Sequence, residues 1–297
     1  MSNFSQLSRY VFGTTRMGDG AIPHEDRVKT ALAAMDSGVW FHTSHQYGDA
    51  LTVLRAAFDQ APEKKPNLIY KIGWSSVEEV EGQIRTQIDA LGKDKMEIGQ
   101  LCPGGDLAED IKKGGSGHAG LMKLKESGLV NSFVLEVFPW TSSTALEAIK
   151  SGNAAGLIDA VIFYLNPLQR FASNELWDLI QEKGLPIVAM RTVSGGDIRQ
   201  LAVNAWAEYQ KPRAQQVLPL FEASGIEKWS EFSARFSLGL PGVKATVGAT
   251  SRLDGLAELL QSTSHTEPLD PNMVIEIQAL QRQWSDEVDM KAEPWTM

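Results

Sequence analysis

Short apolar segments alternate along the chain with segments in which apolar residues recur every three to four positions. Continuous apolar runs of four to eight residues are typical of buried β-strands, and the longer period is typical of helices that cover a core. Val28, Leu32 and Met35 share one helical face in this way. Strands are expected at residues 10–15, 39–43, 68–73, 96–101, 132–137, 160–165, 186–190 and 244–248. Eight strand–helix repeats predict an α/β fold of parallel strands closed into a (β/α)8, or TIM, barrel.

Two regions depart from this alternation. Glycines surround the acidic piece 106–110, so we expect the connection 104–117 to be a mobile loop at the barrel mouth. We expect segment 195–236 to be a rim insertion that adds helices, and segment 270–297 to form a terminal helix and a tail. The whole chain, residues 1–297, is predicted to be a single barrel domain.

Composition limits the class of partner. With 297 residues and 43% hydrophobic content, the chain can form one large core. Its net charge of −9 disfavours nucleic acids and anionic membranes, which attract basic proteins, so we expect a small-molecule substrate. The single cysteine, Cys102, excludes an intramolecular disulfide. The first residues lack the basic and apolar regions of a secretory signal, and we expect a cytoplasmic protein. The oligomeric state is left open.

The strongest candidate chemistry lies where two predicted strands end. Residues 38–48 contain His42 and Tyr47, and residues 68–74 contain Lys71. Because the carboxyl ends of barrel strands meet at one mouth, Tyr47 and Lys71 should face one pocket. A neighbouring cation lowers the pKa of a phenol, so Tyr47 is predicted to act as a general acid.

The same stretch resembles the aldo-keto reductase superfamily. The first signature of that family reads Gly, an aromatic residue, Asp-Thr-Ala, two variable residues and Tyr-Gly, and residues 38–48 follow it with His42 in place of the aspartate. Residues 166–170, 187–191 and 247–252 resemble later segments of the family in the same order. The resemblance implies a TIM barrel and NADPH-dependent reduction of an aldehyde or ketone.

The resemblance also assigns roles to individual residues. The catalytic tetrad of the family, Asp, Tyr, Lys and His, falls on His42, Tyr47, Lys71 and Cys102. The missing histidine would have oriented a carbonyl substrate, and the missing aspartate would have held the lysine charged. Without that carboxylate, Lys71 could have a depressed pKa and form a Schiff base.

The cofactor positions match only in part. Glu136 and Val137 stand where the family has the Ser-Asn pair that grips the nicotinamide carboxamide, and Ile162 replaces a glutamine. The resemblance implies that NADP, if bound, is held by Arg191, Thr192, Gly248, Thr250, Ser251 and Arg252. The substrate pocket is expected to include His45, Trp74 and Trp140.

Alternatives remain at this stage. Glu136 is either a catalytic carboxylate or the partner of Arg191 in an ion pair across the pocket. His42, His45 and Cys102 are suitable zinc ligands, but their spacing matches no known motif, and we expect no metal. A cofactor-independent barrel enzyme could use Tyr47, Lys71, His42 and Glu136 for acid–base chemistry of the lyase, dehydratase or isomerase type. The third possibility is a non-catalytic regulatory barrel.

Overall fold

Eight parallel strands form a closed barrel in the computed structural model, which describes residues 3–73, 77–102, 105–205 and 208–288. Strand β1 pairs with β2 and β9, and β5 pairs with β6, so the sheet has no open edge between these eight strands. The predicted barrel is therefore confirmed. The strands are β1 (Tyr10–Gly13), β2 (Trp40–Ser44), β3 (Leu68–Ile72), β4 (Met96–Leu101), β5 (Val130–Val137), β6 (Ile158–Asn166), β8 (Ile187–Met190) and β9 (Val243–Ala249).

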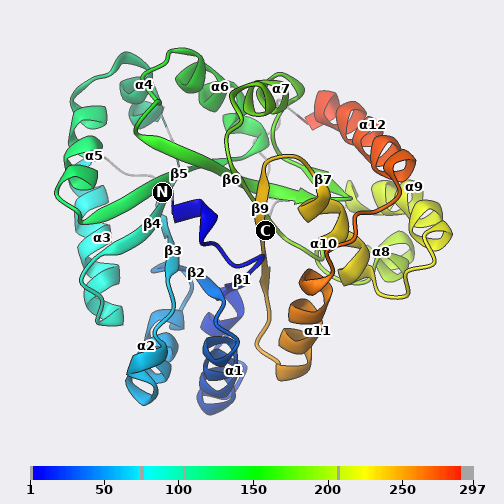
Figure 1. Cartoon of the computed structure of the whole chain (residues 1–297), viewed down its shortest axis with the longest axis horizontal. Coiled ribbons are helices and arrows are strands. Elements are labelled where there is room, and N and C mark those ends of the chain that lie inside the picture. The colour runs from blue at the N-terminus through cyan, green and yellow to red at the C-terminus, as the bar shows by residue number, and fades with distance from the viewer. Residues whose placement is uncertain (1–2, 74–76, 103–104, 206–207, 289–297) are drawn as a thin grey trace.

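Helices surround the barrel as an outer ring (Figure 1). They are α1 (His24–Asp36), α2 (Ala50–Gln60), α3 (Val77–Leu91), α4 (Gly105–Lys113), α5 (Ser116–Glu126), α6 (Ser142–Lys150), α7 (Asn174–Lys183), α8 (Ile198–Asn204), α9 (Gln210–Ala223), α10 (Trp229–Gly239), α11 (Leu253–Ser264) and α12 (Pro271–Val288). Short 3₁₀ turns lie at η1 (Asn3–Ser5), η2 (Thr15–Gly18), η3 (Pro62–Lys64) and η4 (Pro139–Thr141). Within the described ranges, none of these helices has the length and apolar character needed to cross a bilayer.

The glycine-rich connection after β4 is helical, which corrects the expectation of a mobile loop. It forms α4 and α5, joined at Gly114, whose φ of 63° is left-handed. Leu107, Ala108 and Ile111 of α4 are buried. This apolar face at helical spacing stabilises α4 against the barrel, and the glycines serve as helix boundaries.

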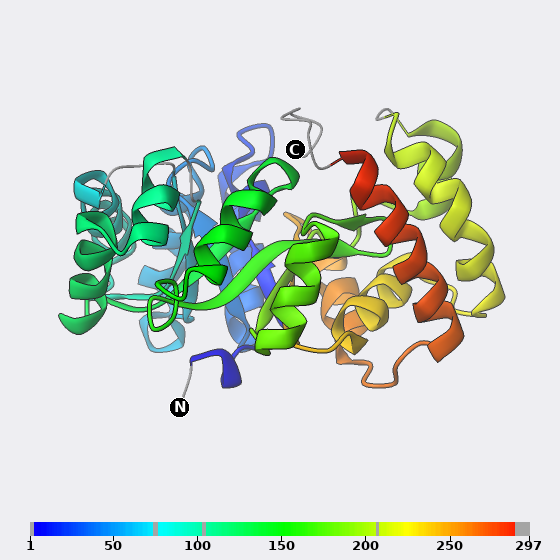
Figure 2. The same cartoon turned by 90° about the horizontal axis from the view of Figure 1, so that it is seen from above.

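Segment 195–236 contains α8, α9 and most of α10, and the chain then returns to β9. Helices α9 and α12 lie side by side in both views (Figures 1 and 2). The Arg213 guanidinium joins them, because it lies 5.0 Å from the Trp284 ring of α12 and 5.2 Å from the Tyr209 ring before α9. A two-residue strand that the sequence did not predict, β7 (Gln169–Arg170), runs antiparallel to the end of β6.

The barrel interior has its own apolar core, separate from the core under the helices. Its members come from successive strands and from η1: Phe4, Val11, Trp40, Ile69, Ile98, Val134, Ile162 and Val188. Side chains on a strand alternate between faces, so the residue two positions after each of the strand residues in this set also points into the barrel, nearer its carboxyl end. The candidate site therefore lies above this interior apolar core, which forms its floor.

Candidate active site

Half-buried Lys71 and buried Glu136 form an ion pair at the carboxyl ends of β3 and β5. Lys71 follows Ile69 by two residues and Glu136 follows Val134 by two, so both point inward above the floor. Lys71 Nζ lies 3.1 Å from Glu136 Oε1. The Lys71 side chain is 20% exposed and that of Glu136 is 1% exposed. The lysine therefore faces the mouth and the carboxylate lies behind it.

Cys102 follows β4, and its thiol donates a hydrogen bond to Glu136 Oε2. Burial and the nearby carboxylate raise the pKa of Cys102 well above its ordinary value. The group is therefore a thiol at neutral pH and a hydrogen-bond donor, not a thiolate nucleophile. Glu136 thus has a partner on each of its two oxygens.

Burial has the largest single effect on Lys71 and disfavours its charged form, but Glu136, Cys102 and Tyr47 together outweigh it, so the pKa of Lys71 lies above its usual range. The structure thereby corrects the expectation of a depressed lysine pKa suited to Schiff-base formation, since a carboxylate is present on another strand. It also gives Glu136 an ion pair with Lys71 instead of Arg191. The Arg191 guanidinium lies over the Tyr164 ring, 5.2 Å from its centre.

Tyr47 lies in the turn between β2 and α2, and close backbone packing fixes that turn. A Cβ on Gly18 of η2 would come within 2.0 Å of the Tyr47 carbonyl oxygen, and one on Gly48 within 2.5 Å of the Gly18 oxygen. Tyr47 also shares a side-chain hydrogen bond with Thr15. Burial raises the pKa of Tyr47 to about 12, although Lys71 acts in the opposite direction. The expected lowering of the phenol pKa is therefore wrong for the free protein, because burial outweighs the cation.

His42 is a buried, neutral group that forms a hydrogen bond across the interior. Its Nε2 lies 2.7 Å from Oε1 of Gln100, and since an amide oxygen only accepts, Nε2 carries the proton. Burial lowers the pKa of His42 to about 4. Gln100 was not predicted to belong to the site, although its position two residues after Ile98 indicates that it points inward. Gln100 Nε2 is buried without a hydrogen-bond partner.

Aromatic rings form one wall beside Lys71. Phe138 and Trp140 stack with ring centres 4.8 Å apart, and Lys71 Nζ lies 5.5 Å from the centre of Phe138. Tyr164 meets the edge of Phe138 at 6.4 Å. Trp140 was predicted to line the pocket, whereas Phe138 and Tyr164 were missed, although Tyr164 follows inward-facing Ile162 by two residues.

Trp74 and His45 are the other two residues predicted to line the pocket. Trp74 lies outside the described residues. The backbone nitrogen of His45 donates to Gln87 Oε1, and its Nδ1 is buried without a partner. Burial lowers the pKa of His45. His45 is therefore held at the start of the same turn as Tyr47.

Arg191 and Thr192 follow β8, at a strained point of the backbone. Arg191 has a φ of 59°, which a residue with a side chain adopts only when its surroundings impose it, and Asn166 Nδ2 donates to its carbonyl oxygen at 3.0 Å. The Thr192 hydroxyl lies 2.7 Å from Thr246 Oγ1 in the barrel wall. This hydroxyl is therefore already paired within the barrel wall.

The remaining predicted cofactor residues cluster between β9 and the N-terminus of α11. Thr250 Oγ1 accepts from the Arg252 backbone nitrogen at 3.1 Å, and the Ser251 carbonyl oxygen accepts from Thr30. The Arg252 side chain is 76% exposed and pairs with Asp254. Gly248 has no side chain, and a Cβ there would meet Leu259 and Thr192 at 3.2 Å. An arginine, hydroxyls and the amide groups of a helix N-terminus are a donor set that fits a phosphate group.

The opposite end of the predicted cofactor groove fits less well. Ile162 is buried in the interior apolar core, and Glu136 has both carboxylate oxygens engaged by Lys71 and Cys102. Neither offers the neutral polar contacts that an amide prefers. Within the described ranges, no three His, Cys, Asp or Glu side chains come close enough together to hold a metal ion.

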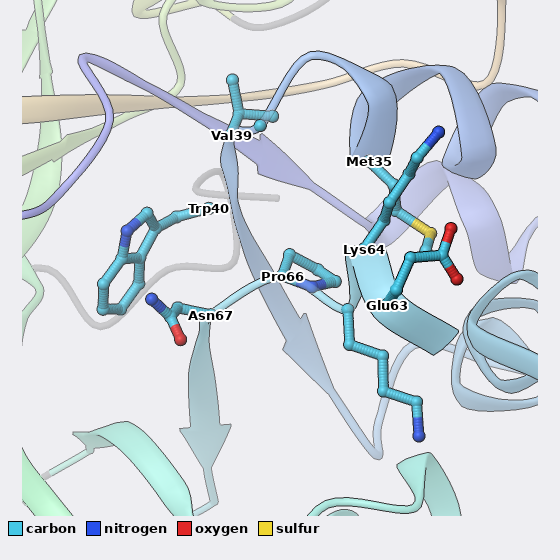
Figure 3. A pocket seen from close by; sticks show the side chains of 9 residues that line it. Met35, Val39, Trp40, Glu63, Lys64, Pro66 and Asn67 are labelled. Carbon is cyan, nitrogen blue, oxygen red and sulfur yellow. The ribbon is translucent and has the colours of Figure 1, made fainter. Parts of the chain in front are cut away.

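A separate hollow lies at the other end of the barrel (Figure 3). It has a volume of about 370 Å³ and lies among Trp40, Pro66 and Asn67 at the beginnings of β2 and β3. Its two lysines are already engaged, Lys64 with Asp36 at 2.7 Å and Lys65 with the Gly92 carbonyl oxygen at 3.1 Å. The chemistry of the strand ends is therefore on the opposite face of the barrel.

Comparison with known proteins decides the family. Residues 9–282 match the model of the aldo/keto reductase family. The chain belongs to this family. A structure of an aldo/keto reductase from Klebsiella pneumoniae in complex with NADP and acetate is similar, with a TM-score of 0.68 and 14% identity over 93% of this chain and 92% of that one. The holo form of an aldo-keto reductase from Bacillus halodurans gives a TM-score of 0.70 and 18% identity over 98% and 95%. Among curated protein sequences there is no significant match.

Membership of the aldo/keto reductase family supports an oxidoreductase. At 14% and 18% identity the two structures establish only that the fold is shared. The tetrad positions of this aldo/keto reductase hold two of the expected residue types, Tyr47 and Lys71, together with His42 and Cys102. The reaction must therefore be argued from the site itself.

Proposed function

We propose that this aldo/keto reductase catalyses NADPH-dependent reduction of an aldehyde or ketone of a small molecule, with Tyr47 as the proton donor. The observation that supports this most directly is that the Tyr47 phenol and the Lys71 ammonium lie near enough at one mouth for each to shift the pKa of the other. Proton transfer to a carbonyl oxygen needs an acid that retains its proton until charge develops on that oxygen.

The residues around the mouth divide the work. With a pKa of about 12, Tyr47 holds its proton at neutral pH. Lys71 remains cationic and stabilises negative charge on the substrate oxygen and on the phenolate that the transfer leaves. Phe138 and Trp140 supply an apolar wall that excludes water from one side of the substrate.

The cofactor assignment rests on the donor set between β9 and α11. Arg252, Thr250 and Ser251 would hold the 2′-phosphate at the α11 N-terminus, and Arg191 would meet the remaining phosphates. The relative from Klebsiella pneumoniae is a complex with NADP. When bound, NADPH supplies the hydride.

Titration of the purified protein with NADPH and NADH, followed by calorimetry or nicotinamide fluorescence, tests this proposal. We expect a sub-millimolar Kd for NADPH. Arg252→Ala should weaken the binding of NADPH by roughly ten-fold and the binding of NADH much less, because it removes a charged partner of the 2′-phosphate. Asp254→Asn, which frees Arg252 from its exposed partner, should tighten the binding of NADPH by roughly two- to five-fold. Failure of both nucleotides to bind at millimolar concentration would remove the reductase proposal.

One observation favours a second candidate, a cofactor-independent acid–base enzyme. Glu136 stands where the family grips the carboxamide, and both its oxygens are already engaged. An enzyme that does not bind nicotinamide could use Tyr47 and Lys71 for lyase, dehydratase or isomerase chemistry on a small molecule. The same titration separates the candidates, because only the reductase requires a nucleotide.

A further inference from the structure

We propose that Glu136 is the positioning residue that keeps Lys71 charged, so that the carboxylate of the active site is supplied from β5 and not from position 42 on β2. Its meaning for catalysis rests on the proposed reductase or acid–base function, but its effect on Lys71 is a property of the free protein. No sequence motif assigns this role, because the two residues are 65 positions apart.

The surroundings of Glu136 are those of an ionised group. Its side chain is almost fully buried, Oε1 accepts from Lys71 Nζ, and Oε2 accepts from the Cys102 thiol. A buried carboxylate is stable only when it is paired and hydrogen-bonded, and these two donors satisfy one oxygen each. Cys102 therefore supports the anion, and the anion in turn supports the ammonium group.

Position 42 cannot supply the charge in this chain. The His42 imidazole is buried and neutral, and its Nε2 proton is directed to Gln100. The titratable groups that act on Lys71 or are influenced by it come from several strand ends: Glu136, Cys102, Tyr47, His42 and Tyr164. Glu136 is the carboxylate in this set.

The barrel geometry explains how the carboxylate that pairs with Lys71 can come from a different strand. Inward positions near the carboxyl ends of β2, β3 and β5 converge on the same volume, so a carboxylate on β5, two strands away, can take the place of one on the adjacent β2. Gln100 also has a buried, unpartnered amide NH₂ group beside position 42. An aspartate placed at position 42 would find a donor there, which makes His42→Asp a possible rescue of a change at Glu136.

The test measures protonation of Lys71 in the free protein. Glu136→Gln and the double variant Glu136→Gln/His42→Asp are labelled with trace acetic anhydride across a pH series, and acetylation of Lys71 is quantified by mass spectrometry. Only the neutral amine reacts, so the labelling rate at fixed pH rises about ten-fold for each pKa unit lost. We expect Lys71 to be acetylated at lower pH in Glu136→Gln than in wild type. In the double variant its pH dependence should return towards that of wild type.

Lys93 provides a matched internal control. It is half-buried and lies 2.7 Å from Glu97 in a second ion pair, so its labelling should stay constant in all variants. If Glu136→Gln does not fold by circular dichroism, Glu136→Asp replaces it. That change keeps the charge and lengthens the contact, and it should give intermediate labelling. Lys71 labelling that is identical in wild type and in the folded Glu136 variant overturns the proposal.

Activity gives the second readout and separates this inference from the proposed function. The alkaline limb of the kcat/KM profile should move to lower pH in Glu136→Gln and recover in the double variant. Those shifts, with KM less affected than kcat, support the proposal that Glu136 acts through Lys71. If wild type turns over no carbonyl substrate while Lys71 labelling still depends on Glu136, the reductase proposal fails and the Glu136 assignment stands.

Discussion

At the scale of single residues, the phenol of Tyr47 is the group on which both enzymatic proposals depend. Tyr47→Phe keeps the ring and removes the proton, so kcat should fall by roughly 10²- to 10⁴-fold with little change in folding stability. Steady-state kinetics on a reduced carbonyl substrate measure this. Tyr70→Phe is a suitable control, because Tyr70 belongs to the core under the helices and should leave kcat within about two-fold.

His42 should make the folding stability depend on pH. Its pKa is about 4 in the folded protein and near 6.5 when unfolded, so the unfolded chain binds more protons between these values. The free energy of unfolding should therefore rise with pH across that window and be lost as pH falls, by at most about 3 kcal/mol from this group.

Urea unfolding of His42→Asn at pH 4.5 and pH 7 measures this dependence. The substitution should flatten the pH slope whatever its effect on absolute stability. His24→Asn is the matched control, because His24 is exposed at the start of α1, and it should leave the slope as in wild type. An unchanged slope in His42→Asn would mean that other groups cause the acid sensitivity.

The sequence predicted some residues of the site and not others for physical reasons. Tyr47 and Lys71 could be found because each follows an apolar strand and carries recognisable chemistry. The pairing of Glu136 with Lys71 could not, because it depends on the register of β3, β4 and β5. The direction of the Tyr47 pKa shift was wrong because only the nearby charge was considered, whereas burial has the larger effect.

At the scale of elements, the turn that carries Tyr47 depends on Gly48. Its φ is 50°, and an added Cβ would come within 2.5 Å of the Gly18 carbonyl oxygen of η2. Gly48→Ala should cost about 1–3 kcal/mol of stability and lower kcat by displacing the adjacent phenol. Thermal unfolding and kinetics together measure both effects.

Gly82 offers the matched control for that substitution. It is exposed in α3, and an added Cβ would meet nothing within 4 Å. Gly82→Ala should stabilise the protein by about 0.5–1 kcal/mol and leave kcat unchanged, since alanine favours a helix more than glycine does. Equal effects of the two substitutions would contradict a special role for the Tyr47 turn.

Element prediction was reliable where periodicity was strong and weaker where glycine was used as the guide. The eight strands follow from apolar runs bounded by turns. Glycines around residues 106–110 suggested a loop, but Leu107 and Ile111 give the segment a buried helical face. The pair of residues in β7 could not be predicted, because it forms only by pairing with the end of β6.

At the scale of the whole molecule, the closed barrel follows from the repeated strand–helix pattern, whereas the docking of the terminal helix does not. Helix α12 packs beside α9 through Trp284 and Arg213, and Gln281 Nε2 donates to the Asn166 carbonyl oxygen at 2.8 Å. Asn166 in turn holds the carbonyl of Arg191. The last helix therefore supports the strained backbone at the barrel mouth.

Removing the largest anchor of α12 should test this support. Trp284 is 4% exposed, so Trp284→Ala leaves a cavity and should reduce the free energy of unfolding by about 3–5 kcal/mol. Ile275→Ala on the same helix is the control, because Ile275 is 62% exposed and its loss should change stability by less than about 0.5 kcal/mol. Denaturant titration measures both. If Trp284→Ala proves as mild as Ile275→Ala, Trp284 does not anchor α12 to the barrel.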